Sequence, residues 1–456
     1  MGYGLSKNMV HGPWSMVYGL WSMVKIPNRS NTNPQNPQAP NTMLSNYIKI
    51  AWKVLLRHPF YTFITLFGIT LTLTVLMVVT SFLDHLFGPH YPENKRNRSL
   101  YIATIMQTDS ANTTMSTGPA SFEFLTKYAK SLKSPERVAI MSNFTFSNAY
   151  TNGKRIKLNT KYTDVDFWSV ADFEFLEGKP YDDTNVRNAD HVAVITDALR
   201  DQYFGSDAET VVGKTIDIEN INYRVVGVVK GSPPTRIYTY SDVYFPYTSP
   251  KSNYEEKGIR GRFVAIVLAK NSSELPAVQA EFQSFVARIP KSEYSNDKRF
   301  NVLIVKADTY FDHFLSMFTR SEKDRLALYA IVGLVLLMIM GLPAVNLVNV
   351  NISRILDRAS EIGVRKAFGA PSKALLWQFI IENVFITFIG GAFALILTLA
   401  VIYFINSSGW IAYADLTINL PVFVTSILVC LVFGLLSGVL PAFRMSRLKI
   451  AEALKV

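Results

Sequence analysis

Four long stretches of this chain contain no charged residue, and they restrict its fold more than any other feature. They lie near residues 60–83, 326–348, 384–404 and 422–440. A helix that crosses a bilayer needs about 20 mainly apolar residues, and each stretch provides them. Because a segment in hydrocarbon must satisfy its own backbone hydrogen bonds, each stretch is predicted to form a membrane-spanning helix.

The positions of Lys and Arg predict how these helices are oriented. Basic residues precede the first stretch, recur in residues 349–382 and follow the fourth stretch, whereas residues 405–420 contain none. Since cytoplasmic loops are enriched in Lys and Arg, both termini are predicted to be cytoplasmic. Residues 88–325 are then extracytoplasmic.

The polar block at residues 88–308 combines two kinds of element. Runs rich in β-branched and aromatic residues predict strands, and they lie at 191–195, 215–229, 241–247 and 261–269. Helical stretches lie between them, at 121–132, 196–203 and 274–287. This order lacks the regular βαβ alternation of a nucleotide-binding fold. The VVGKT run at 211–215 lacks the glycine spacing of a phosphate loop and predicts a turn before a strand instead.

The predicted fold class is therefore an α-helical membrane domain of four transmembrane helices, with a large α+β extracytoplasmic domain inserted between spans 1 and 2.

Residues 1–42 contain a WSMV repeat and a Pro/Asn/Gln tract, which predict a low-complexity, disordered leader. Residues 43–59 predict an amphipathic helix on the cytoplasmic side, lying in the headgroup layer or packed on protein. From there the predicted segments are transmembrane helix 1 (60–87), the extracytoplasmic domain (88–308), a stalk continuous with transmembrane helix 2 (309–348), a cytoplasmic loop (349–382), transmembrane helix 3 (383–405), a short extracytoplasmic loop (406–420), transmembrane helix 4 (421–443) and a cytoplasmic tail (444–456).

Composition and motifs exclude several functional classes. The net charge of +11 is concentrated beside the apolar stretches, where membrane topology accounts for it, so no nucleic acid partner is predicted. Cys430 is the only cysteine and forms no internal disulfide. The six histidines show neither HExxH nor pairing with cysteine, so no metal site is predicted. The sequence has no GxSxG elbow and no pair of intramembrane acids, and no catalytic residue is predicted.

Residues 349–382 form the densest functional candidate. Their charged side chains lie three or four positions apart and so share one helix face opposite an apolar stripe; they are Arg354, Asp357, Arg358, Glu361 and Arg365. Gly369 predicts the end of this helix, Pro371 prevents its continuation, and Ser372 is the predicted N-cap of the next helix. On pattern alone the segment also fits a solvated connector between membrane helices.

Small residues mark predicted packing sites in the membrane helices. Gly390 and Gly391 interrupt the third stretch, and Gly434 and Gly438 form a GxxxG motif in the fourth. Small residues at this spacing let helices approach closely. They fit packing within the chain and packing across a dimer equally well.

The membrane parts resemble the FtsX-like permeases of the macrolide-exporter MacB and lipoprotein-releasing type. The resemblance lies in EIGVRKAFGAPSKALLWQFIIEN (361–383), in LPAFRMSRLKIAEALKV (440–456) and in YTDVDFWSVADFEFLEGKPY (162–181). It also lies in the order of one span, an ectodomain and three further spans. Together these features cover most of the chain from Met43 onward.

That resemblance implies the transmembrane subunit of an ABC transporter in the bacterial cytoplasmic (inner) membrane. Such permeases act by mechanotransmission, in which ATP-driven closure of the ATPase moves the stalk and the ectodomain. The loop would then carry the ATPase-coupling helix, with Arg354, Arg358, Glu361, Gly363, Arg365, Lys366 and Gly369 as its positions. The chain has no Walker motif, so ATP-Mg would be bound by a separate ATPase and the chain itself would need no cofactor.

The same resemblance implies several partners besides the ATPase. Four spans are half the number in versions that carry two such repeats, so a homodimer, or a heterodimer with a second permease, is expected. Membrane lipid and a periplasmic adaptor are further expected partners. A second functional class stays open, namely a signalling scaffold that regulates periplasmic cell-wall hydrolases or senses envelope stress. A scaffold acting alone would not need the charged loop.

Overall fold

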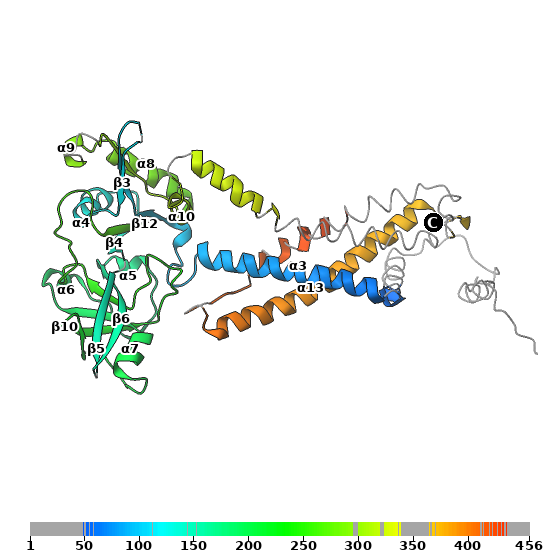
Figure 1. Cartoon of the computed structure of the whole chain (residues 1–456), viewed down its shortest axis with the longest axis horizontal. Coiled ribbons are helices and arrows are strands. Elements are labelled where there is room, and N and C mark those ends of the chain that lie inside the picture. Colours follow the sequence, from blue (N-terminus) through cyan, green and yellow to red (C-terminus); the bar gives the residue numbers. More distant parts are fainter. Residues whose placement is uncertain are drawn as a thin grey trace, which may run out of the picture.

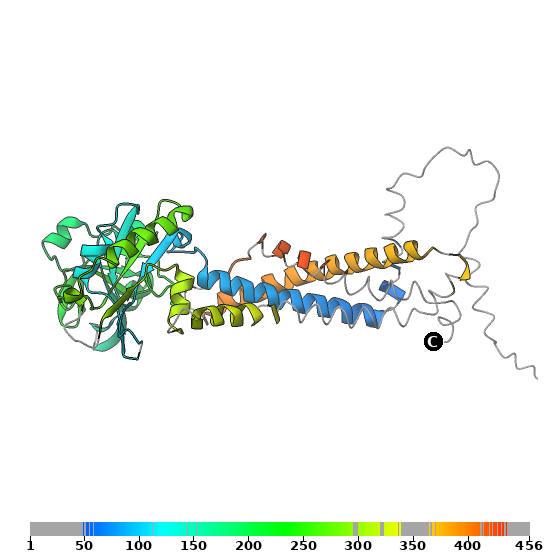
Figure 2. The ribbon, with the colours of Figure 1, turned by 90° about the horizontal axis from the view of Figure 1, so that it is seen from above.

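The computed structural model describes residues 59–319 except 112, 144, 152 and 295–299, residues 323–335, 337–338 and 371–410, and isolated residues within 49–57, 364–369 and 413–435. Figure 1 shows a rounded domain at one end of a set of long helices, and Figure 2 shows the same arrangement from above. The rounded part, residues 88–319, is called the polar domain below.

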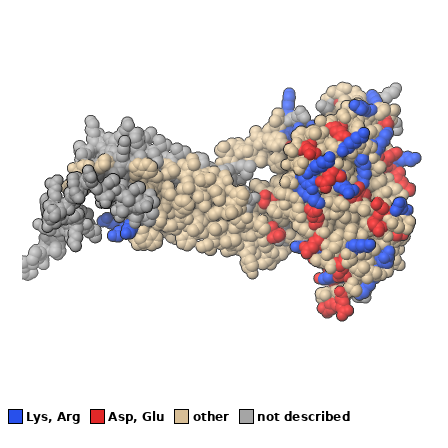
Figure 3. Space-filling model, turned by 180° about the vertical axis from the view of Figure 1, so that it is seen from behind, with Lys and Arg blue, Asp and Glu red and all other residues tan. Residues whose placement is uncertain are grey.

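Two helices among the described residues are long and apolar enough to cross a bilayer. α3 (Pro59–Phe87) contains the stretch Thr62–Phe87, and α13 (Ser372–Ser408) contains the stretch Ile380–Ser408. They coincide with the first and third predicted spans. Figure 3 shows Lys, Arg, Asp and Glu gathered mainly on the polar domain, with few on the described surface of the helices. About half of the second and of the fourth predicted span lies outside the described residues, so the four-helix membrane domain stays a prediction.

α13 joins the end of the cytoplasmic loop and the third span in one helix. Pro371 is extended, with φ −70° and ψ 137°, and it is the N-cap residue. Ser372 is already helical, so the prediction of Ser372 as the N-cap is wrong by one position. The proline ring fixes φ at a value that suits the entry to a helix, which places the boundary one residue earlier. At the other end Gly409 takes a left-handed conformation with φ 67° and ends the helix.

The strands of the polar domain form two sheets. The smaller sheet has the order β13-β2-β3, and the larger has the order β1-β12-β4-β6-β11-β8-β10-β9-β5, with β7 paired to β10. Because β5 also pairs with β6, six strands of the larger sheet close into a ring. The strands are β1 (Ser99–Ile102), β2 (Ile105–Thr108), β3 (Met115–Gly118), β4 (Arg137–Ser142), β5 (Thr145–Thr151), β6 (Lys154–Thr163), β7 (Phe175–Gly178), β8 (Val192–Thr196), β9 (Thr215–Ile218), β10 (Ile221–Val229), β11 (Val243–Pro246), β12 (Phe263–Leu268) and β13 (Val302–Val305).

Short helices and one longer helix complete the domain. They are η1 (Arg96–Arg98), α4 (Phe122–Phe124), the π-helix η2 (Leu125–Ala129), α5 (Phe167–Val170), α6 (Asp183–Arg187), α7 (Asp197–Phe204), η3 (Ser272–Glu274), α8 (Leu275–Val286), α9 (Lys291–Tyr294) and α10 (Tyr310–Ser316). Two apolar cores stabilise the domain, one containing Phe263 and Phe282 and the other containing Phe167, Tyr181 and Tyr244. All five of these side chains are at most 1% exposed, so burial of aromatic surface is a main stabilising term.

The predicted mixture of strands and helices is confirmed. The run at 191–195 becomes β8, and the run at 215–229 becomes the hairpin β9–β10, whose turn residues Glu219 and Asn220 both have positive φ. Two positive φ angles in a two-residue turn match the twist of the flanking strands. Gly213, with φ 88°, lies in a turn just before β9, as predicted for the VVGKT run.

The prediction of one unbroken helix over residues 309–348 is wrong. α10 ends at Ser316, residues 317–319 are not helical, and the described chain is helical again at residue 323. The hydroxyls of Ser316 and Thr319 donate to the carbonyls of His313 and Leu315 at 2.6 and 3.2 Å. Such side-chain bonds give the backbone an alternative to continued helix. The second helix then passes close to α10, where the Tyr329 hydroxyl donates to Asp312.

Candidate functional site: a buried ionic junction

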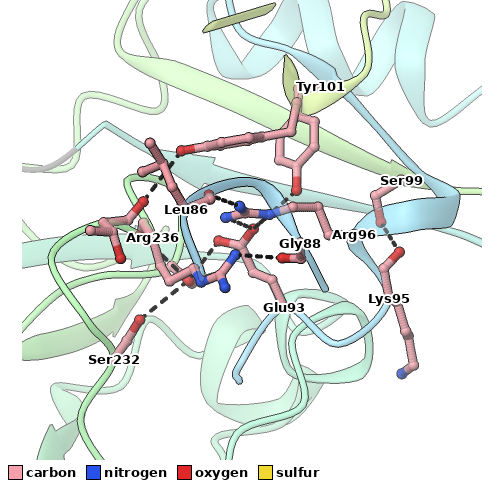
Figure 4. Close-up of polar contacts among 12 residues, drawn as sticks. Leu86, Gly88, Glu93, Lys95, Arg96, Ser99, Tyr101, Ser232 and Arg236 are labelled. Carbon is pink, nitrogen blue, oxygen red and sulfur yellow. Dashed lines mark hydrogen bonds and ion pairs between the residues drawn. The ribbon is translucent and has the colours of Figure 1, made fainter. Parts of the chain in front are cut away.

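Two guanidinium groups of the polar domain bind the end of α3. Arg236 donates to the carbonyl oxygens of His85 and Gly88 at 2.8 and 2.9 Å, and Arg96 donates to that of Leu86 at 2.6 Å. Figure 4 shows both arginines pointing toward this backbone segment. The last carbonyls of a helix lack partners within it and carry partial negative charge. The two arginines therefore cap α3 and neutralise that charge.

A buried carboxylate pairs directly with Arg96 and is stabilised by the nearby charge of Arg236. Glu93 is 4% exposed, and its Oε2 accepts from Arg96 Nε at 2.8 Å and lies 2.7 Å from Arg96 Nη2. Tyr101 donates to the same oxygen at 3.0 Å, and Thr239 donates to Oε1 at 2.8 Å. Burial acts to raise the pKa of Glu93, but the charges of Arg96 and Arg236 and these hydrogen bonds hold the pKa below its usual value. The carboxylate is therefore an anion, and both of its oxygens accept hydrogen bonds.

The same network contacts the base of the segment that leads toward the second span. The guanidinium carbon of Arg96 lies 3.7 Å from the ring centroid of Tyr310 in α10, within cation–π distance. Phe87, the last residue of α3, packs edge-on against Phe311 and Phe314 of α10, with centroid separations of 5.1 and 5.2 Å. The junction, defined as Glu93, Arg96, Arg236, Tyr101 and Tyr310, thus joins α3, α10 and the polar domain.

Local turns bring these residues together. Glu93 and Arg96 are three positions apart at the start of η1, the spacing that puts side chains on one side of a 3-10 turn. Arg236 lies in a pair of tight turns in which its amide donates to the Pro233 carbonyl and its carbonyl accepts from Thr239. Sequence reasoning missed all three charged residues. The available signal was the charge in PENKRNR directly beyond the outer end of the first span.

The residues predicted for ATPase coupling are mostly outside the described part of the chain. Arg354, Arg358, Glu361, Gly363, Arg365 and Lys366 all fall there. Gly369 is described, with φ 85°, a backbone conformation that favours glycine. One residue earlier, the Phe368 amide donates to the Val364 carbonyl at 3.1 Å.

Of the predicted packing glycines, two are described. Gly390 lies against α3, since a Cβ atom added to it would lie 2.6 Å from Ile69 Cγ2. Thr70 donates to the carbonyl oxygen of Gly390 at 3.3 Å, and Thr74 donates to that of Ala394 at 3.4 Å. The close approach of α3 and α13 therefore occurs within one chain. Gly391 has more room, and Gly434 and Gly438 fall outside the described residues.

The described residues show no centre for metal chemistry, because no three His, Cys, Asp or Glu side chains among them are grouped to hold a metal ion. The arrangement instead joins apolar helices to a polar domain through buried charge. Two long apolar helices joined to a large polar domain are consistent with a membrane-anchored protein whose polar domain lies outside the bilayer.

Two protein family models match the chain. The MacB-like periplasmic core domain matches residues 62–285, and the FtsX-like permease C-terminal domain matches residues 333–450. The chain belongs to the MacB/FtsX-type ABC transporter permeases. The apolar helices α3 and α13 are consistent with insertion of this permease in a membrane, with the polar domain as its periplasmic domain.

Curated relatives show the same similarity, and one solved structure aligns with part of the chain. The macrolide export ATP-binding/permease protein MacB of Acinetobacter baylyi is 24% identical over 409 residues, covering 86% of this chain and 57% of that protein. The pyoverdine export ATP-binding/permease protein PvdT of Pseudomonas syringae pv. syringae is 22% identical over 293 residues, covering 64% and 42%. The chain thus spans about half the length of these relatives. The periplasmic region of MacB from Actinobacillus actinomycetemcomitans aligns with a TM-score of 0.33 and 13% identity, over 50% of this chain and 98% of that one.

Proposed function

We propose that this chain is the permease subunit of an ABC transporter of the mechanotransmission type. A separate ATPase binds ATP-Mg and hydrolyses it, and the closure of that ATPase moves the membrane helices and, through them, the polar domain. That movement serves export, efflux or extraction of a substrate. The names of the relatives, which refer to macrolide and pyoverdine export, support a role in export.

The observation that carries this proposal is the buried junction. A flexible linker between α3 and the polar domain would absorb movement of the helix. Here the end of α3 is held by charge-assisted hydrogen bonds from Arg96 and Arg236, and both arginines are at most 4% exposed. Breaking a buried ionic contact by displacing one partner is costly. A shift of α3 is therefore passed to the polar domain as a rigid-body movement.

The length of α13 supports the same mechanism. It contains 37 residues, which at 1.5 Å per residue gives about 55 Å, against a hydrocarbon core of about 30 Å. One helix therefore links the cytoplasmic loop at 349–382 to the outer side of the bilayer. In this proposal both termini are cytoplasmic and residues 88–325 are extracytoplasmic. The segment around Glu361 and Arg365, predicted from its sequence to be a charged helix, docks on the ATPase, and two permease chains form the working dimer.

Co-purification of the full-length chain from its native membrane tests the proposal. We expect a soluble ATPase to be recovered with the parent chain. Glu361→Arg and Arg365→Glu should each reduce its recovery by roughly tenfold, because each reversal places a charge of the wrong sign against the ATPase surface. The reversal Glu255→Lys on the polar domain is the matched control and should retain the ATPase. Retention by both loop variants would refute the coupling assignment. A scaffold acting alone would recover no ATPase with any of these chains.

A further inference from the structure

A second contact between the membrane part and the polar domain is made by a single tyrosine. Tyr413 lies in the loop that follows α13, and its hydroxyl donates to Asp197 Oδ1 at 2.8 Å. Asp197 is the first residue of α7, and the same oxygen accepts from the amides of Ala198 and Gly231 at 2.9 and 3.0 Å. Burial and the Asp197 carboxylate raise the pKa of Tyr413, so the hydroxyl remains a donor.

The ring of Tyr413 sits where a glycine leaves room for it. A Cβ atom added to Gly231 would lie 2.1 Å from Tyr413 Cζ, so any larger residue at 231 would displace the ring. Tyr413 itself has φ 55°, a left-handed conformation that a bulky residue adopts only when its surroundings favour it. The backbone is thus held in a costly conformation that points the tyrosine into this slot.

The base of the Tyr413 loop is fixed by a different set of contacts. The Asn406 side chain donates to the Leu416 carbonyl and accepts from the Leu416 amide, both at 3.0 Å. Ser81 of α3 donates to the Thr417 carbonyl at 2.7 Å. The loop leaves α13 at its first end, and these bonds tie its second end back to α13 and to α3. When the helices move relative to the polar domain, Tyr413 therefore moves with them.

We propose that Tyr413 is a releasable latch, which holds the polar domain in its resting orientation on the membrane helices and opens when the polar domain moves. The junction at the end of α3 contains several buried, charge-assisted bonds, whereas the latch is one hydrogen bond between two half-buried side chains. When the polar domain turns relative to the helices, the weaker of the two attachments separates first. The junction is then the pivot and Tyr413 marks the side that opens.

The latch contact is tested first in the chain without ATP. Tyr413→Phe removes the hydroxyl alone, and Gly231→Ala displaces the ring from the opposite side of the contact. Deuterium uptake of segments 229–233 and 409–418, measured in full-length protein in lipid nanodiscs, should rise about tenfold in both variants, the size expected for loss of one hydrogen bond to a charged group. Uptake equal to that of the parent protein in both variants would overturn the latch.

Matched controls separate this effect from general loosening. Tyr403→Phe alters a tyrosine on α13 that is 75% exposed, and Gly118→Ala adds a methyl where the nearest atom is 3.9 Å away. Both controls should leave the uptake of the two segments unchanged. Because this measurement needs no ATPase, it decides the contact even if the proposed transport function fails.

Release of the latch, which rests on the proposed function, is tested by tethering. Cysteines replace Tyr413 and Asp197 in a Cys430→Ser background, and a cleavable bifunctional thiol reagent joins them. With the partner ATPase and ATP present, the change in deuterium uptake across the polar domain should be lost in the tethered protein and return when the tether is cleaved. An ATP-dependent change that persists in the tethered protein would refute release, while the contact itself is judged by the resting measurement.

Discussion

Glu93 is the residue on which the junction depends, because among the described carboxylates it is the one that pairs with Arg96 and accepts from Tyr101 and Thr239. Glu93→Gln would leave two buried guanidinium groups without an anion, and the cost is about 3–5 kcal/mol of unfolding free energy. Thermal unfolding of the full-length protein in nanodiscs measures the loss. Glu136→Gln, whose partner Arg98 forms an exposed ion pair, is the control and should cost about 1 kcal/mol or less. Equal effects of the two variants would contradict the prediction.

Glu93→Gln should also change how the stability of the folded protein depends on pH. The folded-state pKa of Glu93 is lowered, so its stabilising contribution is present above the unfolded pKa of about 4.3 and is lost as the pH falls through the lower folded value. The parent protein should therefore lose stability below about pH 4 more steeply than Glu93→Gln. Parallel curves for the two proteins in that range would show that Glu93 is not held as an anion.

Lys161 is a buried charge whose replacement should stabilise the protein, in contrast to the replacement of Glu93. Its amine is 1% exposed and donates to the Ser142 carbonyl at 3.1 Å, and burial lowers the pKa of Lys161 to about 7, with Glu93 offsetting part of that shift. Because the unfolded pKa is about 10.4, the parent protein should gain stability as the pH rises from about 7 toward 10. Lys161→Met should abolish that rise and should stabilise the protein at pH 7 by about 1–4 kcal/mol.

Unfolding midpoints at pH 7 and pH 9.5 measure the effect of Lys161→Met. The exposed Lys154→Met is the matched control and should keep the parent pH profile. If Lys161→Met destabilises the protein at both pH values, the amine contributes more through its contact with Ser142 than it costs by burial.

At the scale of elements, the packing of α3 on α13 depends on Gly390. Gly390→Ala should separate the helices, because the new methyl would lie 2.6 Å from Ile69 Cγ2, and overpacking of this kind costs about 1–3 kcal/mol. Gly391→Ala is a matched control on the same helix, since both changes raise helix propensity equally while the nearest atom to Gly391 is 3.5 Å away. Thermal stability in detergent should fall for Gly390→Ala alone, and adding Ile69→Ala should recover part of the loss. A similar fall for both glycine variants would contradict the prediction.

The elements also show what the sequence could predict. β8 and the β9–β10 hairpin were predictable because β-branched residues and turn residues are local signals. The break after α10 was missed because residues 317–325 contain no Gly or Pro to indicate it, while the hydroxyls of Ser316 and Thr319 end the helix. The junction was not predictable, because Glu93 and Thr239 meet only through the tertiary fold, 146 positions apart. Charged residues next to a membrane span were therefore interpreted as topology signals alone.

At the scale of the whole molecule, the polar domain is attached to the helices at two kinds of contact. The junction holds the end of α3 and the base of α10, and Tyr413 holds the loop after α13. The two attachments differ in burial and in the number of their bonds, so they should respond differently to substitution. Loss of the latch should loosen the resting state, whereas loss of the junction should disconnect helix movement from domain movement.

Arg236→Gln tests this disconnection. It removes the two bonds from Arg236 to the end of α3 and leaves the bond from Arg96 to Leu86 and the Glu93–Arg96 pair, so the polar domain should remain folded. The partner ATPase should still bind, since its proposed docking site lies on the other side of the membrane, but the ATP-dependent change in deuterium uptake of the polar domain should fall about tenfold, because a loosened contact absorbs the movement of α3. Arg98→Gln, at an exposed ion pair, is the control and should keep the full change. A full ATP-dependent change in Arg236→Gln would show that α3 is not the helix that moves the domain, and α13 with its Tyr413 loop would become the candidate for that role.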